Sequence, residues 1–110
     1  MNIGIDIEEI VRFKLPKNHY FLKSTFTEKE LKYAFARPKP QIHLCGFFCV
    51  KEAVRKTGTA SKLLMKEIEV VHKKNGQPEV KINKRGNNWR FKVSISHSGM
   101  YAVGCAILEE

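Results

Sequence analysis

The spacing of apolar residues changes along this chain, from a helical period in the first half to a period of two after about residue 67. A short alternating run at residues 2–6 opens the chain and reads as a strand. The order is therefore strand, helices and then an antiparallel meander, which predicts an α+β fold with helices packed on an antiparallel sheet. A chain of 110 residues without repeats is expected to form one domain, residues 1–110.

Two helices are expected in the central part of the chain. Thr27 and Glu30 form a capping-box pattern, in which each side chain can bond the backbone amide of the other. The helix that they start should end before Pro38, because proline disfavours helical geometry in the residue before it. A second helix should run over about 41–57, with Gly58 as its terminator.

Strands are expected after these helices. A hairpin is predicted over residues 68–82, with its turn at Asn75-Gly76. Residues 89–96 alternate between apolar and polar side chains, which is typical of a strand with one buried face. The nearly continuous apolar run 101–108 predicts a central strand buried on both faces.

Polar side chains are expected at the ends of two of these strands. Asp6 comes where the strand pattern gives way to the helical spacing of Ile10 and Val11, so it is predicted at a strand-to-helix or strand-to-loop junction. Pro16 should stop any long first helix. His97 lies in the segment that should break the strand over 89–96.

The formal net charge of +9 favours an anionic partner, such as nucleic acid, a membrane surface, a phosphorylated ligand or an acidic protein. A basic nucleic-acid-binding domain is one interpretation, because cations flank aromatic residues at Trp89-Arg90-Phe91-Lys92. The alternation places Trp89 and Phe91 with the core, where they are poor platforms for base stacking. No recognised nucleic-acid-binding motif is present, so we expect no nucleic-acid partner.

The cysteine pattern and the apolar stretches bear on the compartment. Cys45, Cys49 and Cys105 have apolar neighbours and form no Cys-x-x-Cys pair, which predicts reduced, buried thiols in a cytoplasmic protein. Met1 leads directly into the first strand without a signal peptide. No apolar stretch approaches the roughly 20 residues of a membrane span, so no membrane association is expected.

Two acids and a lysine could form a metal-dependent site. Asp6 and Glu52 offer carboxylate oxygens, and two such ligands with phosphate oxygens and waters make a usual magnesium site. Lys56 follows Glu52 by one helical turn and could neutralise phosphate charge there. Taken singly, Asp6 could instead be a strand-end cap, and Glu52 a salt-bridge partner of Lys56.

His97 lies between Ser96 and Ser98, and the three side chains offer several donors to a phosphate or a ribose. A Ser-His-Asp hydrolase is a competing interpretation, but the chain lacks a nucleophile-elbow pattern, and a serine adjacent to its histidine rarely has the required geometry. A turn histidine without a function is the third interpretation. His43 and His72 have no supporting context in the sequence.

The order and spacing of these segments resemble the holo-(acyl carrier protein) synthase family of phosphopantetheinyl transferases over essentially the whole chain. That family has an opening Gly-x-Asp-x-x-x-x-x-Arg pattern, a Phe-Thr-x-x-Glu-Leu segment before an aromatic residue, a Lys-Glu-Ala-x-x-Lys helix, and a Ser-Ile-Ser-His segment followed by Tyr-Ala. The matching residues are Gly4, Asp6, Glu9, Ile10 and Arg12; Phe26, Thr27, Glu30, Leu31 and Tyr33; Lys51, Glu52, Ala53 and Lys56; and Ser94, Ile95, Ser96, His97, Ser98, Tyr101 and Ala102.

The resemblance implies transfer of the 4′-phosphopantetheine group from coenzyme A to a serine of apo acyl carrier protein in fatty acid biosynthesis, with release of 3′,5′-ADP. It implies that Asp6 and Glu52 hold Mg2+ on the pyrophosphate and that Lys56 contacts a phosphate oxygen. Glu52 is the candidate general base. The residues expected around the nucleotide are Lys51, Lys56, Gly58, Ser96 and His97.

The resemblance also implies partners. The family docks its acidic carrier protein on a basic patch in the first helix, which Arg12, Lys14 and Lys17 would match. Family members of this length are trimers with the site between subunits, so a homotrimer is expected. Two departures concern the segment 56–60, which is one residue shorter than usual and lacks its last glycine, and the helix cut by Pro16. A non-catalytic member of the same fold is a further alternative.

Overall fold

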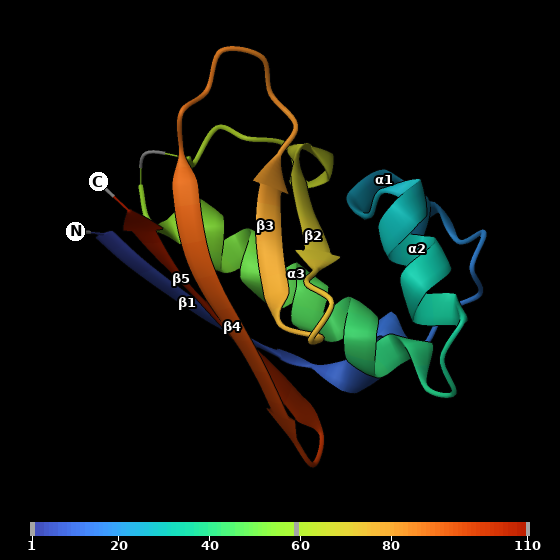
Figure 1. Ribbon diagram of the computed structural model, residues 1–110. Coiled ribbons are helices and arrows are strands. Elements are labelled where there is room, and N and C mark those ends of the chain that lie inside the picture. Colours follow the sequence, from blue (N-terminus) through green and yellow to red (C-terminus); the bar gives the residue numbers. More distant parts are fainter. Residues whose placement is uncertain (1, 59, 110) are drawn as a thin grey trace.

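The chain folds around one long helix that lies across a three-stranded antiparallel sheet (Figure 1). The computed structural model describes residues 2–58 and 60–109. Its elements are β1 (Asn2–Glu9), the 3-10 helix η1 (Ile10–Phe13), α1 (Tyr20–Thr25), α2 (Glu28–Phe35), α3 (Pro40–Lys56), the 3-10 helix η2 (Met65–Glu67), β2 (Ile68–His72), β3 (Pro78–Ile82), β4 (Arg90–Ser98) and β5 (Tyr101–Glu109). This is the α+β arrangement that the sequence predicted.

The strands form two separate antiparallel sheets. β5 is the centre of the larger sheet, whose order is β1-β5-β4, and Asp6 pairs with Gly104 in it. β2 and β3 form the predicted hairpin, with Gly76 at φ +90° in its turn. The prediction of one continuous meander is wrong at one step, because β3 and β4 pack side by side but belong to different sheets.

Glycine at two positions lets α3 lie directly on the larger sheet. A Cβ atom on Gly4 would overlap the carbonyl oxygen of Ala53, and one on Gly104 would lie 2.7 Å from the amide nitrogen of Val50. These are backbone atoms of α3, so a side chain at either position would push the whole helix away. Gly4 of the opening motif is therefore required by packing.

β1 is longer than the sequence predicted. It runs to Glu9, so Asp6 lies in the middle of a strand and not at its end. The alternative that Asp6 caps a strand end is therefore wrong. The helical spacing of Ile7, Ile10 and Val11 was misleading, because Ile7 still belongs to the strand. Its side chain continues the alternation on the open face of the sheet, where it is 59% exposed. Only the single turn of η1 follows.

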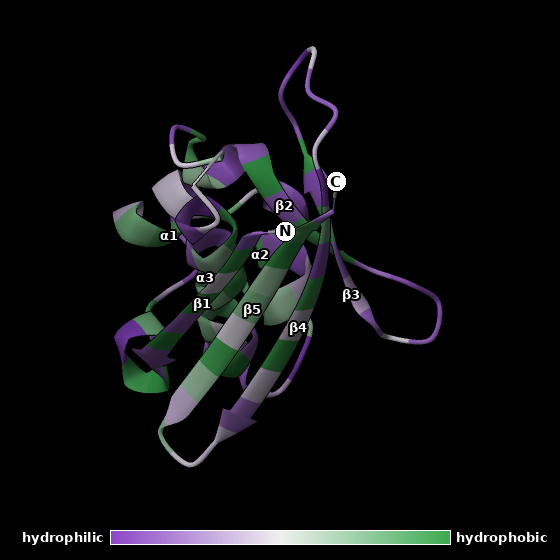
Figure 2. Ribbon diagram, turned by 90° about the vertical axis from the view of Figure 1, so that its left-hand side faces the viewer, coloured by the Kyte–Doolittle hydropathy of each residue, from purple (hydrophilic) through white to green (hydrophobic). Residues whose placement is uncertain are grey.

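The sheet face turned away from α3 is apolar and open to solvent (Figure 2). On β1, Ile3, Ile5 and Ile7 are 67%, 61% and 59% exposed. The outward residues of β5 beside them are half-buried, from Val103 to Ile107, whereas its inward residues are buried. β5 is thus the central strand, as predicted, but in the single chain only its inner face is fully buried.

The local signals for both main helices are confirmed. The side-chain oxygen of Thr27 accepts from the Glu30 amide at 3.2 Å, and the Glu30 carboxylate accepts from the Thr27 amide at 2.9 Å. Pro40 occupies the first turn of α3, where its missing N–H group has no partner to lose. Gly58 follows α3 at φ +96°, the left-handed conformation that commonly ends a helix.

The three cysteines are free thiols, as predicted, but Cys105 is only partly buried, contrary to the prediction that all three are buried. Cys45 and Cys49 are buried where α3 meets the sheet, with the Cys49 Sγ atom 3.4 Å from the carbonyl oxygen of Ala102. Among the described residues, none of the helices has both the length and the apolar character that crossing a bilayer would demand.

Candidate active site

The end of α3 lies against the middle of β1, and this contact brings two of the predicted site residues together. The Nζ atom of Lys56 lies 3.0 Å from Oδ1 of Asp6 and 3.2 Å from the carbonyl oxygen of Ile5. Asp6 faces α3 because Gly4, Asp6 and Glu8 share the inward side of β1. The pair combines a buried acid, 8% exposed, with a half-exposed cation at the edge of the sheet.

The other carboxylate oxygen of Asp6 accepts no hydrogen bond from a donor group in the described part of the chain. Oδ2 is buried and makes no hydrogen bond within the described residues, although buried polar atoms of this kind are normally satisfied. A carboxylate oxygen in this state is suited to a cation. Magnesium prefers such oxygens and takes few protein ligands, so the donor set fits this ion. The described residues hold no group of three or more His, Cys, Asp or Glu placed for a metal.

Glu52 belongs to the same electrostatic cluster, but it does not pair with Lys56. Its Oε1 atom accepts from Nη1 of Arg55 at 3.2 Å, so the alternative of a Glu52–Lys56 salt bridge is wrong. The hydrogen bond to Asp6 raises the pKa of Lys56 above its ordinary value, and the charges of Asp6, Glu52 and Glu8 add to this effect. Lys56 therefore remains an ammonium at neutral pH, as a phosphate contact requires.

Glu8 is a member of this cluster that the sequence analysis missed. Its side chain is 18% exposed, and burial, followed by its contact with Asp6, raises the pKa of its carboxyl group. Arg12 opposes this rise in pKa, because its guanidinium forms an ion pair with Glu8. The same guanidinium lies 5.9 Å from the ring centroid of Phe48. The sequence did carry a signal for Glu8, because it is the next inward position after Asp6 in the alternation of β1.

Lys51 lies away from this cluster and is fully enclosed. Its Nζ atom contacts Oε1 of Glu30 at 2.7 Å and donates to the carbonyl oxygens of Met65 at 2.8 Å and Ile68 at 2.6 Å. These three acceptors match the three N–H groups of an ammonium. The assignment of Lys51 to the nucleotide is therefore wrong, and its bonds tie α3 to α2 and β2.

Of the other predicted nucleotide contacts, Ser96 and His97 line a hollow that shares Ile7 and Val103 with the cavity beside Asp6 and Lys56. Gly58 is exposed beyond the end of α3. Ser96 lines a shallow hollow on the outer face of the sheet. His97 is exposed near the end of β4 and also lines a cavity on the β4 side of α3. Thr59, in the shortened segment after α3, lies outside the described residues.

Two histidines that the sequence left without context, His43 and His72, line this cavity together with His97. They come from α3 and β2, which meet only in the folded chain. Sequence carried no signal for them, because they are far apart along the chain and neither is part of a motif.

The three cations predicted to dock the carrier protein lie at the surface, whereas the aromatic residues beside Arg90 lie against the core. Arg12, Lys14 and Lys17 are exposed on η1 and on the segment that leads to α1. Trp89 and Phe91 are half-buried and pack against the core, so they do not form a stacking surface for bases.

The fold and this site define the class of protein. Residues 2–106 match the family model described as the 4′-phosphopantetheinyl transferase superfamily. The chain is 39% identical over 118 residues to the holo-[acyl-carrier-protein] synthase of Caldicellulosiruptor saccharolyticus, covering 99% of this chain and 96% of that relative. It is 40% identical over 110 residues to the synthase of Thermodesulfovibrio yellowstonii, with 96% of both chains covered.

Solved structures agree with this classification. The holo-(acyl-carrier-protein) synthase of Bacillus anthracis, crystallised in complex with CoA (3′,5′-ADP), matches with a TM-score of 0.82 and 28% identity, over 97% of this chain and 94% of that one. The chain therefore belongs to the holo-[acyl-carrier-protein] synthase family of enzymes.

Proposed function

We propose that the protein transfers the 4′-phosphopantetheine group of coenzyme A to a serine of an acidic apo acyl carrier protein. The serine oxygen forms a bond to the phosphorus next to pantetheine, and the pyrophosphate bond of coenzyme A breaks. 3′,5′-ADP leaves with the electron pair of that bond, and the serine proton passes to a base. The product carrier would serve fatty acid biosynthesis, and the reduced thiols favour a cytoplasmic enzyme.

The observation that carries the proposal is the state of Asp6. A buried carboxylate with one oxygen on an ammonium and the other without a hydrogen-bond donor among residues 2–58 and 60–109 is costly unless a ligand or a cation completes it. We propose that Asp6 and Glu52 hold Mg2+ there. The ion would supply positive charge to the pyrophosphate oxygens.

The residues of the cluster have separate roles in this proposal. Lys56 stays charged and contacts a phosphate oxygen as negative charge builds up on the leaving group. Glu52 takes the serine proton, directly or through a water molecule. Arg55 holds the Glu52 carboxylate at 3.2 Å and fixes its direction. Positioning and charge neutralisation would then account for most of the rate enhancement.

The substrates approach from two sides. We propose that the nucleotide of coenzyme A lies against Ser96 and His97, with Gly58 near its phosphates. The acidic carrier protein docks on Arg12, Lys14 and Lys17, where the net charge of +9 favours its approach.

We propose a homotrimer with the site between neighbouring subunits. The outer face of β1 supports self-association, because three adjacent isoleucines at 59–67% exposure are unusual on a solvated surface. In this arrangement a neighbouring subunit would contribute residues to the site.

Incubation of the protein with coenzyme A, Mg2+ and an apo acyl carrier protein tests the proposal. Intact mass of the carrier should increase by one phosphopantetheine group, and 3′,5′-ADP should appear in equal amount. Asp6→Ala should abolish both. If several carriers stay unmodified although they bind the protein, the non-catalytic alternative is favoured instead.

A further inference from the structure

Glu8 lies between the acid cluster and the surface proposed for carrier docking. It follows Asp6 on the inward side of β1, and its side chain is 18% exposed. On one side it contacts the Asp6 carboxylate, and on the other side it forms an ion pair with the Arg12 guanidinium. A single carboxylate is thus shared between the candidate cation site and a candidate docking cation.

Three acids meet in this cluster, and each is held by a different cation. The ion pairs are Asp6–Lys56 at 3.0 Å, Glu52–Arg55 at 3.2 Å and Glu8–Arg12. Burial raises the pKa of Glu8, and the contact with Asp6 and the charge of Glu52 add to the rise, so the three carboxylates act on one another. Like charges this close are unfavourable unless cations compensate them. A substrate that takes one of these cations therefore frees a carboxylate for a new partner.

Each substrate of the proposed function binds one of these cations. A phosphate of coenzyme A would take Lys56, which leaves Asp6 to a divalent ion. An acidic group of the carrier protein would take Arg12, which leaves Glu8 without its counterion. The second exchange links the docking surface to the acid cluster.

Arg12 is placed to exchange one carboxylate for another. Its side chain is 51% exposed, and the guanidinium carbon lies 5.7 Å from the ring centroid of Phe13 and 5.9 Å from that of Phe48. A guanidinium has several N–H donors, so it can engage an incoming carboxylate while the aromatic rings keep it in place.

Glu8 is anchored and does not follow Arg12 towards the carrier. Its backbone is paired with Ala102 in the sheet, and the Sγ atom of Cys45 on α3 lies 3.6 Å from its carbonyl oxygen. A carboxylate on this rigid strand stays beside Asp6 when Arg12 engages another partner. Only a side-chain rotation is then needed to turn it towards the cation site.

We propose that Glu8 couples carrier docking to cation binding: an acidic group of the carrier engages Arg12, and the released Glu8 carboxylate turns towards the divalent cation of the acid cluster and strengthens its binding. The inference rests on the proposed function, from which it takes the carrier and the cation. Mg2+ keeps several of its waters in protein sites, and a carboxylate that accepts from such a water tunes the affinity. Glu8 is a positioning residue in this proposal. By linkage, the cation must raise the affinity for the carrier by the same factor.

Mn2+ provides a probe of the cluster that needs no turnover. It takes the same carboxylate and water ligands as Mg2+, and the EPR signal of free Mn2+ measures how much is bound. Arg12→Gln should bind Mn2+ roughly tenfold more tightly than the wild type, because Glu8 is then free to turn. The gain should be much smaller when Arg12→Gln is added to Glu8→Gln, and the difference between the two gains measures the coupling.

The carrier itself provides the second readout. An apo carrier whose acceptor serine is replaced by alanine docks without being modified. Its presence should raise the Mn2+ affinity of the wild type by roughly the same tenfold, with the carrier alone titrated as the blank. In Glu8→Gln the carrier should leave the Mn2+ affinity unchanged.

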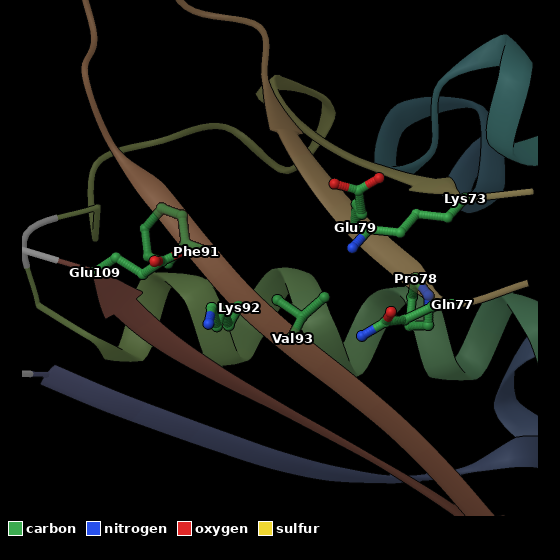
Figure 3. Close-up of a pocket in the computed structure, with 8 residues that line it drawn as sticks. All are labelled: Lys73, Gln77, Pro78, Glu79, Phe91, Lys92, Val93 and Glu109. Atoms are coloured by element: carbon green, nitrogen blue, oxygen red, sulfur yellow. The ribbon is translucent and has the colours of Figure 1, made fainter. Parts of the chain in front are cut away.

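Two control variants separate this exchange from general charge. Lys14→Gln removes an exposed cation of the docking surface and should raise the Mn2+ affinity far less than Arg12→Gln. Glu79 is an acid among cations away from the cluster, in a hollow of about 270 Å³ against β3 and β4 that Lys73 and Lys92 also line (Figure 3). Glu79→Gln should keep both the Mn2+ affinity and its dependence on the carrier.

The outcomes separate this coupling from the proposed function. If Arg12→Gln leaves the Mn2+ affinity unchanged, or raises it equally with and without Glu8, while the carrier is still modified, the coupling is overturned and the proposed function stands. If no carrier binds but the gain from Arg12→Gln depends on Glu8, the exchange at Glu8 stands and the proposed function falls.

Discussion

The ammonium of Lys56 lies 3.0 Å from Oδ1 of Asp6, so the last residue of α3 is bonded to the middle of β1. Packing of α3 on this strand makes the contact possible, because Gly4 lets the helix backbone approach β1 directly. The arrangement leaves Oδ2 of Asp6 buried, with no hydrogen-bond donor supplied by the residues that the structure describes. The same packing that builds the core thus prepares a carboxylate for a ligand.

Asp6→Asn should therefore reduce turnover strongly while preserving the fold. The amide keeps the shape of the side chain but removes the charge, and losing one charge-stabilising group typically costs about 100-fold or more in rate. Carrier modification should be followed by mass, and Mg2+ affinity by calorimetry. Glu79→Gln, an exposed acid on β3, is the matched control. Full turnover in Asp6→Asn would remove Asp6 from the site.

The elements that sequence predicted well are those whose signals are local. The capping box of Thr27 and Glu30, the helix before Gly58 and the hairpin turn at Gly76 each depend on neighbours within a few residues. The length of β1 depends on pairing with β5 at the other end of the chain, as in the pair of Asp6 and Gly104, and no local pattern carries that information.

For the site residues, too, local sequence motifs predicted some features, and features that depend on the folded chain were missed. Asp6 and Lys56 were found because they stand in spaced motifs, and the fold joins them. Lys51 belongs to the same motif but was misassigned, because sequence does not show that three acceptors enclose its ammonium. His43 and His72 share a cavity only after α3 and β2 pack together, so their proximity is a property of the tertiary structure.

Ile5→Asp should dissociate the proposed trimer and abolish turnover without unfolding the chain. Ile5 is 61% exposed on the outer face of β1, so a charge there is tolerated in water but not in a buried interface. Light scattering should report a monomer, and circular dichroism an unchanged fold. Leu64→Asp, at a residue 69% exposed outside this face, should leave the mass unchanged. A monomeric wild type would contradict the prediction.

Lys14→Glu should weaken the carrier more than the coenzyme. Lys14 is exposed beside Arg12, and reversing a charge on a docking surface reduces the association rate, here by roughly tenfold at low salt. Raised salt should shrink the difference between variant and wild type, because exposed charges are screened. The KM for each substrate should be measured over a salt series, with Lys84→Glu in the distant β3–β4 loop as the control. Equal effects of the two reversals would show that net charge alone matters.

Acid should destabilise the free protein through His43 and His72. Their pKa values are lower in the folded chain than the ordinary 6.5, so folding favours the neutral rings. The stability they contribute is present above pH 6.5 and is lost as the pH falls towards their folded pKa values. Glu8, whose pKa is raised by burial, contributes with the opposite sign. The melting temperature of His43→Gln/His72→Phe should therefore depend less on pH between about 7 and about 5 than that of the wild type.

Lys51→Met should cost about 3–5 kcal/mol of unfolding free energy, because it leaves the buried Glu30 carboxylate without its cation. The Glu30 carboxylate also accepts from the amides of Thr27 and Val70, at 2.9 Å and 2.8 Å, so it cannot turn to solvent without breaking the start of α2. Adding Glu30→Gln should restore part of the loss, since the amide oxygen can still accept while the unpaired charge disappears. Urea denaturation of the two single variants and the double variant measures this coupling. Additive losses in the double variant would mean that the two side chains stabilise the fold independently, contrary to the 2.7 Å contact between them.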